Sequence, residues 1–281
     1  MGPRSNEFDR ATQTHDALLG WGVSVMKVAS FNVNSIRARL PAVISWLQKN
    51  QPDALAMQET KVQDDEFPKA AFEEIGYSCV FRGQKGYNGV AVAARHPIAG
   101  VQFGLPDEPR DEARLLRSSI RNLIVVNTYV PQGDLPTSDR FQYKLAWFGR
   151  LLDYFRTSLR PTDPVLWMGD LNIAPLPIDV YDPVTLLGHV CYHPAVHQAL
   201  EEIMRWGFTD VFRLHCRDAG KYTFWDYRLS NSFQRNRGWR LDHIMATQPL
   251  ADRCTACYID TEPRVGPRPS DHTPIMAEFN W

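Results

Sequence analysis

Six short segments of the chain carry carboxylate, amide or imidazole side chains, and each stands at the end of an apolar run. An aspartate or asparagine in such a place is commonly an ordinary turn former, so a single segment says little. Six together predict one site assembled from strand ends, with chemistry that suits a hard divalent cation acting on a phosphate ester. The segments are 31–34, 58–60, 127–129, 169–172, 241–243 and 270–272.

Glu59 follows the apolar run 54–57, where a carboxylate is costly unless it is paired or bound to a cation. Mg²⁺ takes oxygen ligands and keeps several waters, so one or two carboxylates are enough to hold it. We therefore expect Glu59 to be a metal ligand; the alternative is an acid that caps the next turn. Asn32 and Asn34 are compatible both with turns and with hydrogen bonds to a carboxylate or a phosphate.

Asp170 and Asn172 leave one strand at alternate positions, so their side chains are expected on one face. An acid there can orient an attacking water while the amide holds a phosphate oxygen. His272 precedes the last apolar run, and an aspartate that held its ring would make it a fixed donor toward developing phosphorane charge. Asp242 follows Leu241. His243 should face the other side of its strand and is expected to be structural.

Strands and helices must bring these positions together. Short apolar runs predict strands, and apolar residues repeating every three to four positions predict helices. The successive strands between residues 77 and 130 have short connections and are expected to pair antiparallel. Strands are expected at 28–31, 54–57, 77–81, 89–94, 115–120, 123–130, 165–168, 241–246, 256–260 and 274–279, and helices at 41–49 (with Pro41 in its first turn), 69–75, 139–159 and 194–206.

The pattern predicts an α/β fold in which two packed sheets of mixed pairing lie under helical layers. The proposed site draws on both ends of the span 26–281, and no repeat or linker interrupts it, so a single catalytic domain is expected there. Residues 1–25 are polar and lack periodicity, which predicts a flexible N-terminal extension that is not a secretory leader.

Composition narrows the setting of the protein. No apolar run approaches the roughly 20 residues of a membrane span, so no membrane partner is expected. Five cysteines do not make a disulfide framework, which favours a reducing compartment. The pair Cys254 and Cys257 is interpreted as inert thiols rather than as a metal or redox site.

The net charge is only −1, yet the arginines are clustered. A protein of nearly zero charge can still present a basic face to a phosphate backbone, and the alternative is that these arginines lie in solvated loops. One cluster is Arg110, Arg114, Arg117 and Arg121, and the other is Arg228, Arg235, Arg237 and Arg240.

On these segments the chain resembles the exonuclease III family of DNA-repair nucleases, within the wider endonuclease/exonuclease/phosphatase superfamily. The resemblance covers essentially 26–281 and extends to GDLNIAP at 169–175, YTFWDYR at 222–228 and RPSDHTP at 268–274. It implies a four-layer α/β sandwich of two mixed sheets flanked by helices. The chain departs from its relatives at Ser119, near which they often carry an acid, and this bears on DNA-strand contacts rather than on the metal site.

The resemblance also implies roles for individual residues. Glu59 would be the principal ligand of Mg²⁺, for which Mn²⁺ is a possible substitute, and Asp271 and Asn34 would lie near the metal. Asp170 would activate water or protonate the leaving oxygen, and these two roles stay open. The remaining catalytic residues would be Asn172, Asn32 and Tyr129 on the scissile phosphate and Asp242 paired with His272.

The superfamily also contains phospholipases and inositol-phosphate phosphatases, so the substrate must be read from the loops. The segment 222–227 is aromatic at four of its six positions and is followed by arginines, which suits nucleic-acid stacking and phosphate contact; core packing is the alternative. The resemblance places Phe224, Trp225 and Trp239 in an abasic-site pocket and Arg114 on the DNA backbone. Two loop arginines, Arg228 and Arg237, are expected to contact DNA as well.

The resulting expectation is a Mg²⁺-dependent hydrolase that cuts DNA 5′ to abasic sites and leaves a 3′-OH. It would also act as a 3′–5′ exonuclease and clean blocked 3′ ends as a phosphatase or phosphodiesterase. Its partner would be double-stranded DNA with abasic sites or recessed or blocked 3′ ends. We expect a cytoplasmic, nucleoid-associated, bacterial-type monomer. The alternatives are a phosphatase or phospholipase of the same superfamily and a non-catalytic DNA-binding relic.

Overall fold

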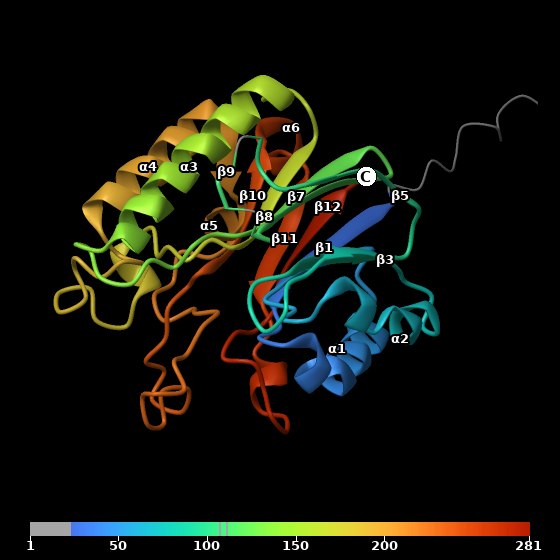
Figure 1. The fold of residues 1–281 in the computed structure, drawn as a ribbon, viewed down its shortest axis with the longest axis horizontal. Coiled ribbons are helices and arrows are strands. Elements are labelled where there is room, and N and C mark those ends of the chain that lie inside the picture. Colours follow the sequence, from blue (N-terminus) through green and yellow to red (C-terminus); the bar gives the residue numbers. More distant parts are fainter. Residues whose placement is uncertain (1–23, 107, 111) are drawn as a thin grey trace, which may run out of the picture.

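The computed structural model describes residues 24–281 apart from residues 107 and 111, and these form two six-stranded sheets packed face to face with helices outside (Figure 1). The α/β sandwich expected from the sequence is confirmed. The first sheet has the order β11 (Cys254–Ile259), β12 (Ile275–Asn280), β1 (Val25–Asn32), β2 (Ala54–Gln58), β4 (Val90–Ala94) and β3 (Ser78–Arg82). The second has the order β5 (Ile98–Phe103), β6 (Leu115–Ile120), β7 (Leu123–Tyr129), β8 (Val165–Asp170), β10 (Asp242–Thr247) and β9 (Phe208–Asp210).

Three apolar layers hold the sheets and helices together. Successive side chains of a strand point to opposite faces, so each central strand supplies two layers. In β2, Ala54 and Ala56 face the other sheet, whereas Leu55 and Met57 face the outer helices α1 (Ile36–Asn50) and α2 (Lys69–Glu73). These strands therefore read as continuous apolar runs, because both of their faces are buried.

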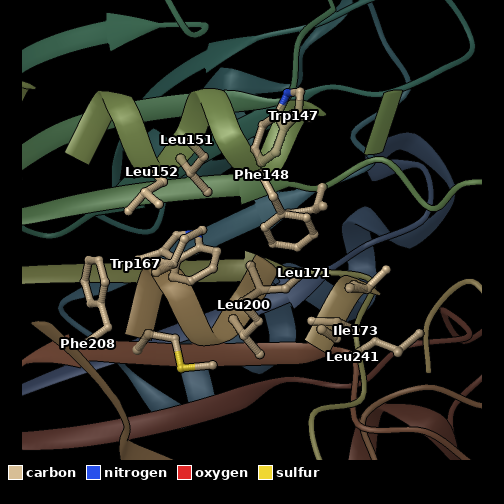
Figure 2. Packing of buried hydrophobic residues seen from close by; sticks show 14 of the residues in the cluster. Trp147, Phe148, Leu151, Leu152, Trp167, Leu171, Ile173, Leu200, Phe208 and Leu241 are labelled. Carbon is tan, nitrogen blue, oxygen red and sulfur yellow. The ribbon is translucent and has the colours of Figure 1, made fainter. Parts of the chain in front are cut away.

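The outer layer of the second sheet is formed by α3 (Asp139–Ser158) and α4 (Pro194–Gly207), which lie side by side (Figure 1). Figure 2 shows Phe148, Leu151 and Leu152 of α3 gathered over Trp167 of β8, with Leu200 of α4 close by. The ring of Trp167 lies 5.7 Å from that of Phe155 in an edge-to-face contact. This packing fixes β8, the strand that ends at Asp170.

A buried polar contact joins the two sheets beneath the expected site. Asn127 of β7 donates to the carbonyl oxygens of Met57 (3.0 Å) and Ala91 (2.9 Å) in the other sheet. It also accepts a hydrogen bond from Gln58 (2.7 Å). All of the polar atoms of this contact are paired, so it costs little to bury and fixes how the sheets face each other.

Some expectations were wrong in detail. The helix expected at 41–49 begins at Ile36, with Pro41 inside it rather than in its first turn. The amide of Ile36 donates to the carbonyl of Thr60 after β2, and that of Ser35 to the carbonyl of Glu59, so a tertiary contact sets where the helix begins. Seven elements were not expected: β5 and β9, the short helices α5 (Val211–His215) and α6 (Gln248–Ala251), and the 3₁₀-helices η1 (Asp64–Glu66), η2 (Pro177–Asp179) and η3 (Glu262–Arg264).

The expected antiparallel succession holds only in part. Strands β3 and β4 pair antiparallel, and so do β6 and β7. The two pairs belong to different sheets, because the unexpected strand β5 carries the chain across between them. β5 is largely exposed at a sheet edge, so it lacks the apolar pattern that would have revealed it. The expected extension 1–25 falls mostly on 1–23, outside the described residues, and Val25 opens β1. The single domain stays a prediction.

Candidate active site

The polar segments meet at one edge of the two sheets because of the strand directions. β1 runs parallel to β2, and β7 runs parallel to β8, so each pair ends on the same side. β10 runs antiparallel to β8 and begins where β8 ends, so Asp242 lies opposite Asp170, which in turn neighbours Tyr129 of β7. Three side chains expected to act together thus come from three adjacent strands at one level.

An open cavity of about 350 Å³ lies at this edge. Of the residues expected to be catalytic or to bind metal, all but Asn32 and Asp242 line it, and those two are hydrogen-bonded to residues that do. The lining residues from that set are Asn34, Glu59, Tyr129, Asp170, Asn172, Asp271 and His272.

Asn32 links the two acids at the centre of the cavity. Its amide nitrogen donates to Glu59 (2.7 Å) and to Asp170 (2.9 Å), one acid from each sheet. Ligand atoms of Glu59, Asp170 and His272 all lie within 4.8 Å of one another. The oxygen donors of this group suit a hard divalent cation, so the residues present fit the metal that the sequence predicts.

The other two expected ligands lie close by but are turned toward each other. The amide nitrogen of Asn34 donates to a carboxylate oxygen of Asp271 at 2.9 Å. The backbone of Asn34, Glu59 and Asn172 has positive φ angles of 42°, 52° and 49°. Non-glycine residues rarely adopt this conformation, and its cost is commonly borne at functional sites.

Sequence reasoning missed Lys61. Its ammonium forms an ion pair with Glu59 (2.7 Å) and donates to the side-chain oxygen of Asn34 (2.6 Å). Burial by itself would raise the pKa of Glu59, but the charge and hydrogen bond of Lys61 hold it below its ordinary value. The only signal in the sequence was the position of Lys61, two residues after the predicted ligand Glu59. In the structure both residues line the cavity.

Two buried aspartates set the charge of His272. Its Nδ1 lies 2.7 Å from Asp242, and its Nε2 lies 3.7 Å from Asp170. Burial would lower the pKa of His272, but the two carboxylates raise it to about 10, so the ring is an imidazolium at neutral pH. Burial, with the nearby carboxylates, raises the pKa of Asp170 to about 7. Burial also raises the pKa of Tyr129 well above its ordinary value, which keeps its hydroxyl protonated.

The aromatic loop divides between the cavity and the interior. The ring of Phe224 lines the cavity and lies 4.8 Å from that of His272. Trp239 pairs with Phe224 as a β-bridge and lines an adjoining cavity of about 160 Å³ together with His189. Trp225 is 2% exposed, and its indole nitrogen bonds to Asn236, away from both cavities. Alternate residues of an extended segment point to opposite sides, which separates Trp225 from Phe224.

The arginine clusters do not act as units. Arg228 lines the catalytic cavity, where it is paired with Asp226, whereas the side chain of Arg237 lies outside it. Arg240 is fully buried between Asp179 and Asp210, so neither a basic face nor a solvated loop, the two expectations for the second cluster, holds for this arginine. A buried arginine needs carboxylate partners, and these come from segments distant in sequence.

The first cluster also divides, because β6 separates its members. Arg110 and Arg114 line a groove of about 710 Å³ that shares Tyr129 and Gln132 with the catalytic cavity. Arg121, at the opposite end of β6, contacts Ser24. The groove carries two further cations, Lys85 and Arg140, and so it offers a positive surface beside the catalytic cavity.

Lys144 joins three segments of the chain beside Asn172. Its buried ammonium donates to the carbonyls of Gln132 (3.1 Å), Asn172 (2.6 Å) and Val190 (2.7 Å). We expect Lys144→Met to lower the free energy of unfolding by about 2–4 kcal/mol, because the buried carbonyls of Asn172 and Val190 and the partly buried carbonyl of Gln132 lose their donor. Urea denaturation measures this. Lys69→Met, which breaks an exposed pair, should stay within about 0.5 kcal/mol of wild type, and an equal loss in both variants would contradict the assignment.

His243 is structural, as expected. Its ring bonds the carbonyl of Ile173 (2.8 Å) and Arg240 (2.9 Å), on the side of the strand facing away from the cavity. Burial, reinforced by the charge of Arg240, lowers its pKa to about 4 from an ordinary 6.5. Between these values the unfolded chain binds the extra proton, so stability rises with pH through this window and falls on acidification.

The expected contribution of His243 is about 3 kcal/mol, lost as the pH falls from 6.5 toward 4. His243→Gln removes the titrating group, so its free energy of unfolding should fall less steeply over that window than that of wild type. Urea titrations at several pH values measure both slopes. Identical slopes would show that other groups carry the acid sensitivity.

Comparison with known proteins agrees with this geometry. Residues 29–272 match the Endonuclease/Exonuclease/phosphatase family. The chain is 34% identical over 267 residues to exodeoxyribonuclease III of Haemophilus influenzae, covering 90% of this chain and 100% of that protein. It is 49% identical to a solved AP endonuclease from Archaeoglobus fulgidus, with a TM-score of 0.89 and coverage of 91% and 100%. The 3′-5′ exonuclease NExo from Neisseria meningitidis is 37% identical, with a TM-score of 0.87 and the same coverage.

The fold and the site together define a hydrolase with a group of acidic side chains, at the edge of two packed sheets, that could hold a metal ion. The chain belongs to the endonuclease/exonuclease/phosphatase family and, within it, to the exonuclease III group of nucleases. Enzymes of this family depend on a divalent metal. Among the helices of the described chain, none has the length and apolar character needed to cross a membrane.

Proposed function

We propose that this DNA-repair nuclease is a Mg²⁺-dependent phosphodiesterase that cuts duplex DNA 5′ to abasic sites and leaves a 3′-OH. We include 3′–5′ exonuclease action and the cleaning of blocked 3′ ends in this activity. One observation carries the proposal: the paired acids Glu59 and Asp170 and the charged His272 share a cavity with Phe224, next to a cation-lined groove. The relatives are an exodeoxyribonuclease III, an AP endonuclease and a 3′-5′ exonuclease, which supports this choice of substrate.

The chain's own residues provide most of the machinery for an in-line attack. The imidazolium of His272, the phenol of Tyr129 and the amide of Asn172 donate to the non-bridging oxygens of the scissile phosphate. Asp170 accepts a proton from the attacking water. The backbone N–H of Asn172 (2.9 Å) and the side chain of Asn32 (2.9 Å) donate to its carboxylate and fix it in place. Its raised pKa of about 7 makes this carboxylate a stronger base than an ordinary aspartate.

The metal would be held by Glu59, with Asp271 and Asn34 beside it, and when bound it supplies positive charge to the phosphate and the leaving oxygen. Lys61 lies on these same groups and keeps Glu59 ionised. Uncatalysed phosphodiester hydrolysis is so slow that the residues together must lower the barrier by on the order of 20 kcal/mol. No single contact supplies that amount.

Substrate selection would fall to the aromatic wall and the groove. A sugar that has lost its base leaves the duplex cheaply, because no base stacking is lost. Phe224 and Trp239 line the two adjoining cavities and would receive that sugar. The groove that contains Arg114 would hold phosphates of the bound strand. The buried Trp225 would support the loop rather than touch the sugar. The exposed Arg237, outside the cavity, would contact the DNA backbone.

The decisive experiment compares an abasic duplex with an intact blunt duplex, with and without Mg²⁺. We expect a single nick 5′ to the abasic site that requires Mg²⁺, is stopped by a chelator and returns when Mg²⁺ or Mn²⁺ is added back. Slower shortening of the blunt duplex from its 3′ end would report the exonuclease. Metal-independent nicking, or phosphate release from inositol phosphates with no nicking, would overturn the proposal.

We also propose that the enzyme works as a monomer on the chromosomal DNA of a bacterial-type cytoplasm. One chain supplies every side chain of the cavity, so no second copy is needed to complete it. Sedimentation analysis of the protein with and without a short abasic duplex checks the stoichiometry. A dimer that binds one duplex would contradict it.

A further inference from the structure

One arginine touches three of the loops that build the metal side of the site. Arg39, in the first turns of α1, donates to the backbone carbonyl of Asn34 at 2.6 Å. Its other terminal nitrogen donates to the hydroxyl of Tyr227 at 3.2 Å and to the carbonyl of Pro269 at 3.1 Å. These partners belong to three segments: Asn34 follows β1, Tyr227 belongs to the aromatic segment 222–227, and Pro269 precedes Asp271.

A second arginine, Arg264, contacts two of the same segments. Arg264 is 8% exposed and donates to the carbonyl of Ser270. Its guanidinium lies 5.2 Å from the ring of Phe233, 5.6 Å from that of Tyr227 and 5.7 Å from that of Trp225. The hydroxyl of Tyr227 in turn donates to the carbonyl of Pro269. The Tyr227 side chain therefore contacts both arginines, Arg39 through its hydroxyl and Arg264 through its ring.

We propose that Arg39 is a positioning residue that sets the affinity of the site for its divalent cation, an inference that rests on the proposed function. Asn34 and Asp271 stand at opposite ends of the sequence, and the direct contact between them is one hydrogen bond of 2.9 Å. Arg39 adds two backbone contacts across the same gap. Its planar fork can bond both loops at once, which the single ammonium of a lysine on a flexible stem does poorly.

The sign of the effect separates positioning from simple electrostatics. Removing a positive charge near a cation site should tighten metal binding if charge alone matters. Loss of positioning should weaken it instead, and groups that orient metal ligands commonly contribute 10–100-fold in metal affinity. Arg39→Met is therefore expected to raise the Kd for Mg²⁺ by about 10–100-fold. Arg39→Lys, which keeps the charge, should also weaken binding and should not restore the wild-type value.

The test is calorimetric titration of Mg²⁺ into the full-length, DNA-free protein, together with the Mg²⁺ concentration that half-saturates nicking of an abasic duplex. Both should rise in parallel, while KM for the duplex at saturating Mg²⁺ stays within about twofold of wild type. Lys49→Met is the matched control, because it also removes a cation of α1 that pairs with the segment before Pro269, at Glu262. Lys49 contacts none of the three groups that Arg39 joins, so the Kd of Lys49→Met for Mg²⁺ should equal that of wild type.

Tyr227→Phe provides a second variant that keeps the arginine. It removes only the hydroxyl that accepts from Arg39 and donates to Pro269, so a smaller rise in Kd is expected. If Arg39→Met fails to fold, this variant decides, and a wild-type Kd in it overturns the inference. Unchanged or tighter Mg²⁺ binding in folded Arg39→Met also overturns it. If wild type itself binds no Mg²⁺, the proposed function fails instead.

Discussion

Replacement of Asp170 by asparagine is expected to reduce turnover on an abasic duplex by at least about 10²-fold, with duplex binding retained. The change keeps the size of the side chain and its capacity to accept from the backbone N–H of Asn172 at 2.9 Å. It removes the negative charge and the ability to take up a proton. The variant therefore lacks the base, with its raised pKa of about 7, that we propose accepts a proton from the attacking water.

Single-turnover nicking and a separate binding titration without metal measure the two quantities independently. Asp153→Asn is a suitable control, because this aspartate is exposed on the outer helix α3 and makes only a surface ion pair. Its turnover should equal that of wild type. Near-normal cleavage by Asp170→Asn would rule out Asp170 as the group that handles the proton.

His272→Ala is expected to cost at least about 10²-fold in turnover as well, because it removes the charged donor that we propose for the scissile phosphate. The milder change Asp242→Asn tests whether the positive charge of His272 is the cause of this effect. Asp242 contributes most to the raised pKa of His272, which is about 10 in the intact protein. Without that charge the pKa falls, so the imidazolium should lose its proton at lower pH.

The pH dependence of turnover then separates the roles of these two residues. In wild type, the contribution of the imidazolium is present below about pH 10 and is lost as the pH rises through that value. In Asp242→Asn the alkaline loss should begin at lower pH, while activity at acidic pH is better preserved than in His272→Ala. Coincident alkaline limbs in wild type and Asp242→Asn would show that Asp242 does not set the charge of His272.

Much of the site was predictable because its residues stand at strand ends. The register of β7, β8 and β10 places Tyr129, Asp170 and Asp242 at one level. Strands that are buried on both faces can be recognised in the sequence as apolar runs. β5 was missed for the opposite reason, since an exposed edge strand needs no apolar alternation. The start of α1 was misplaced because carbonyl groups after β2 define it.

Side-chain direction was the main thing that sequence reasoning did not supply. Phe224 and Trp225 are adjacent and both aromatic, yet one lines the cavity and the other is buried behind it. Arg228 and Arg240 belong to one sequence cluster, yet the first borders the site and the second is enclosed by carboxylates. The two members of each pair are alike in residue type and lie close together in the sequence. Only the segments against which their side chains pack distinguish them.

The sequence by itself determined the layered α/β architecture, the strand ends that carry acids and amides, and the class of chemistry those groups can perform. Local pattern suffices there, because burial on two faces and polar termination are properties of single segments. Tertiary structure decided that Lys61 contacts Glu59 and Asn34 and that Arg39 joins loops from both ends of the chain. Such contacts depend on where distant segments come to rest, and no local spacing encodes them.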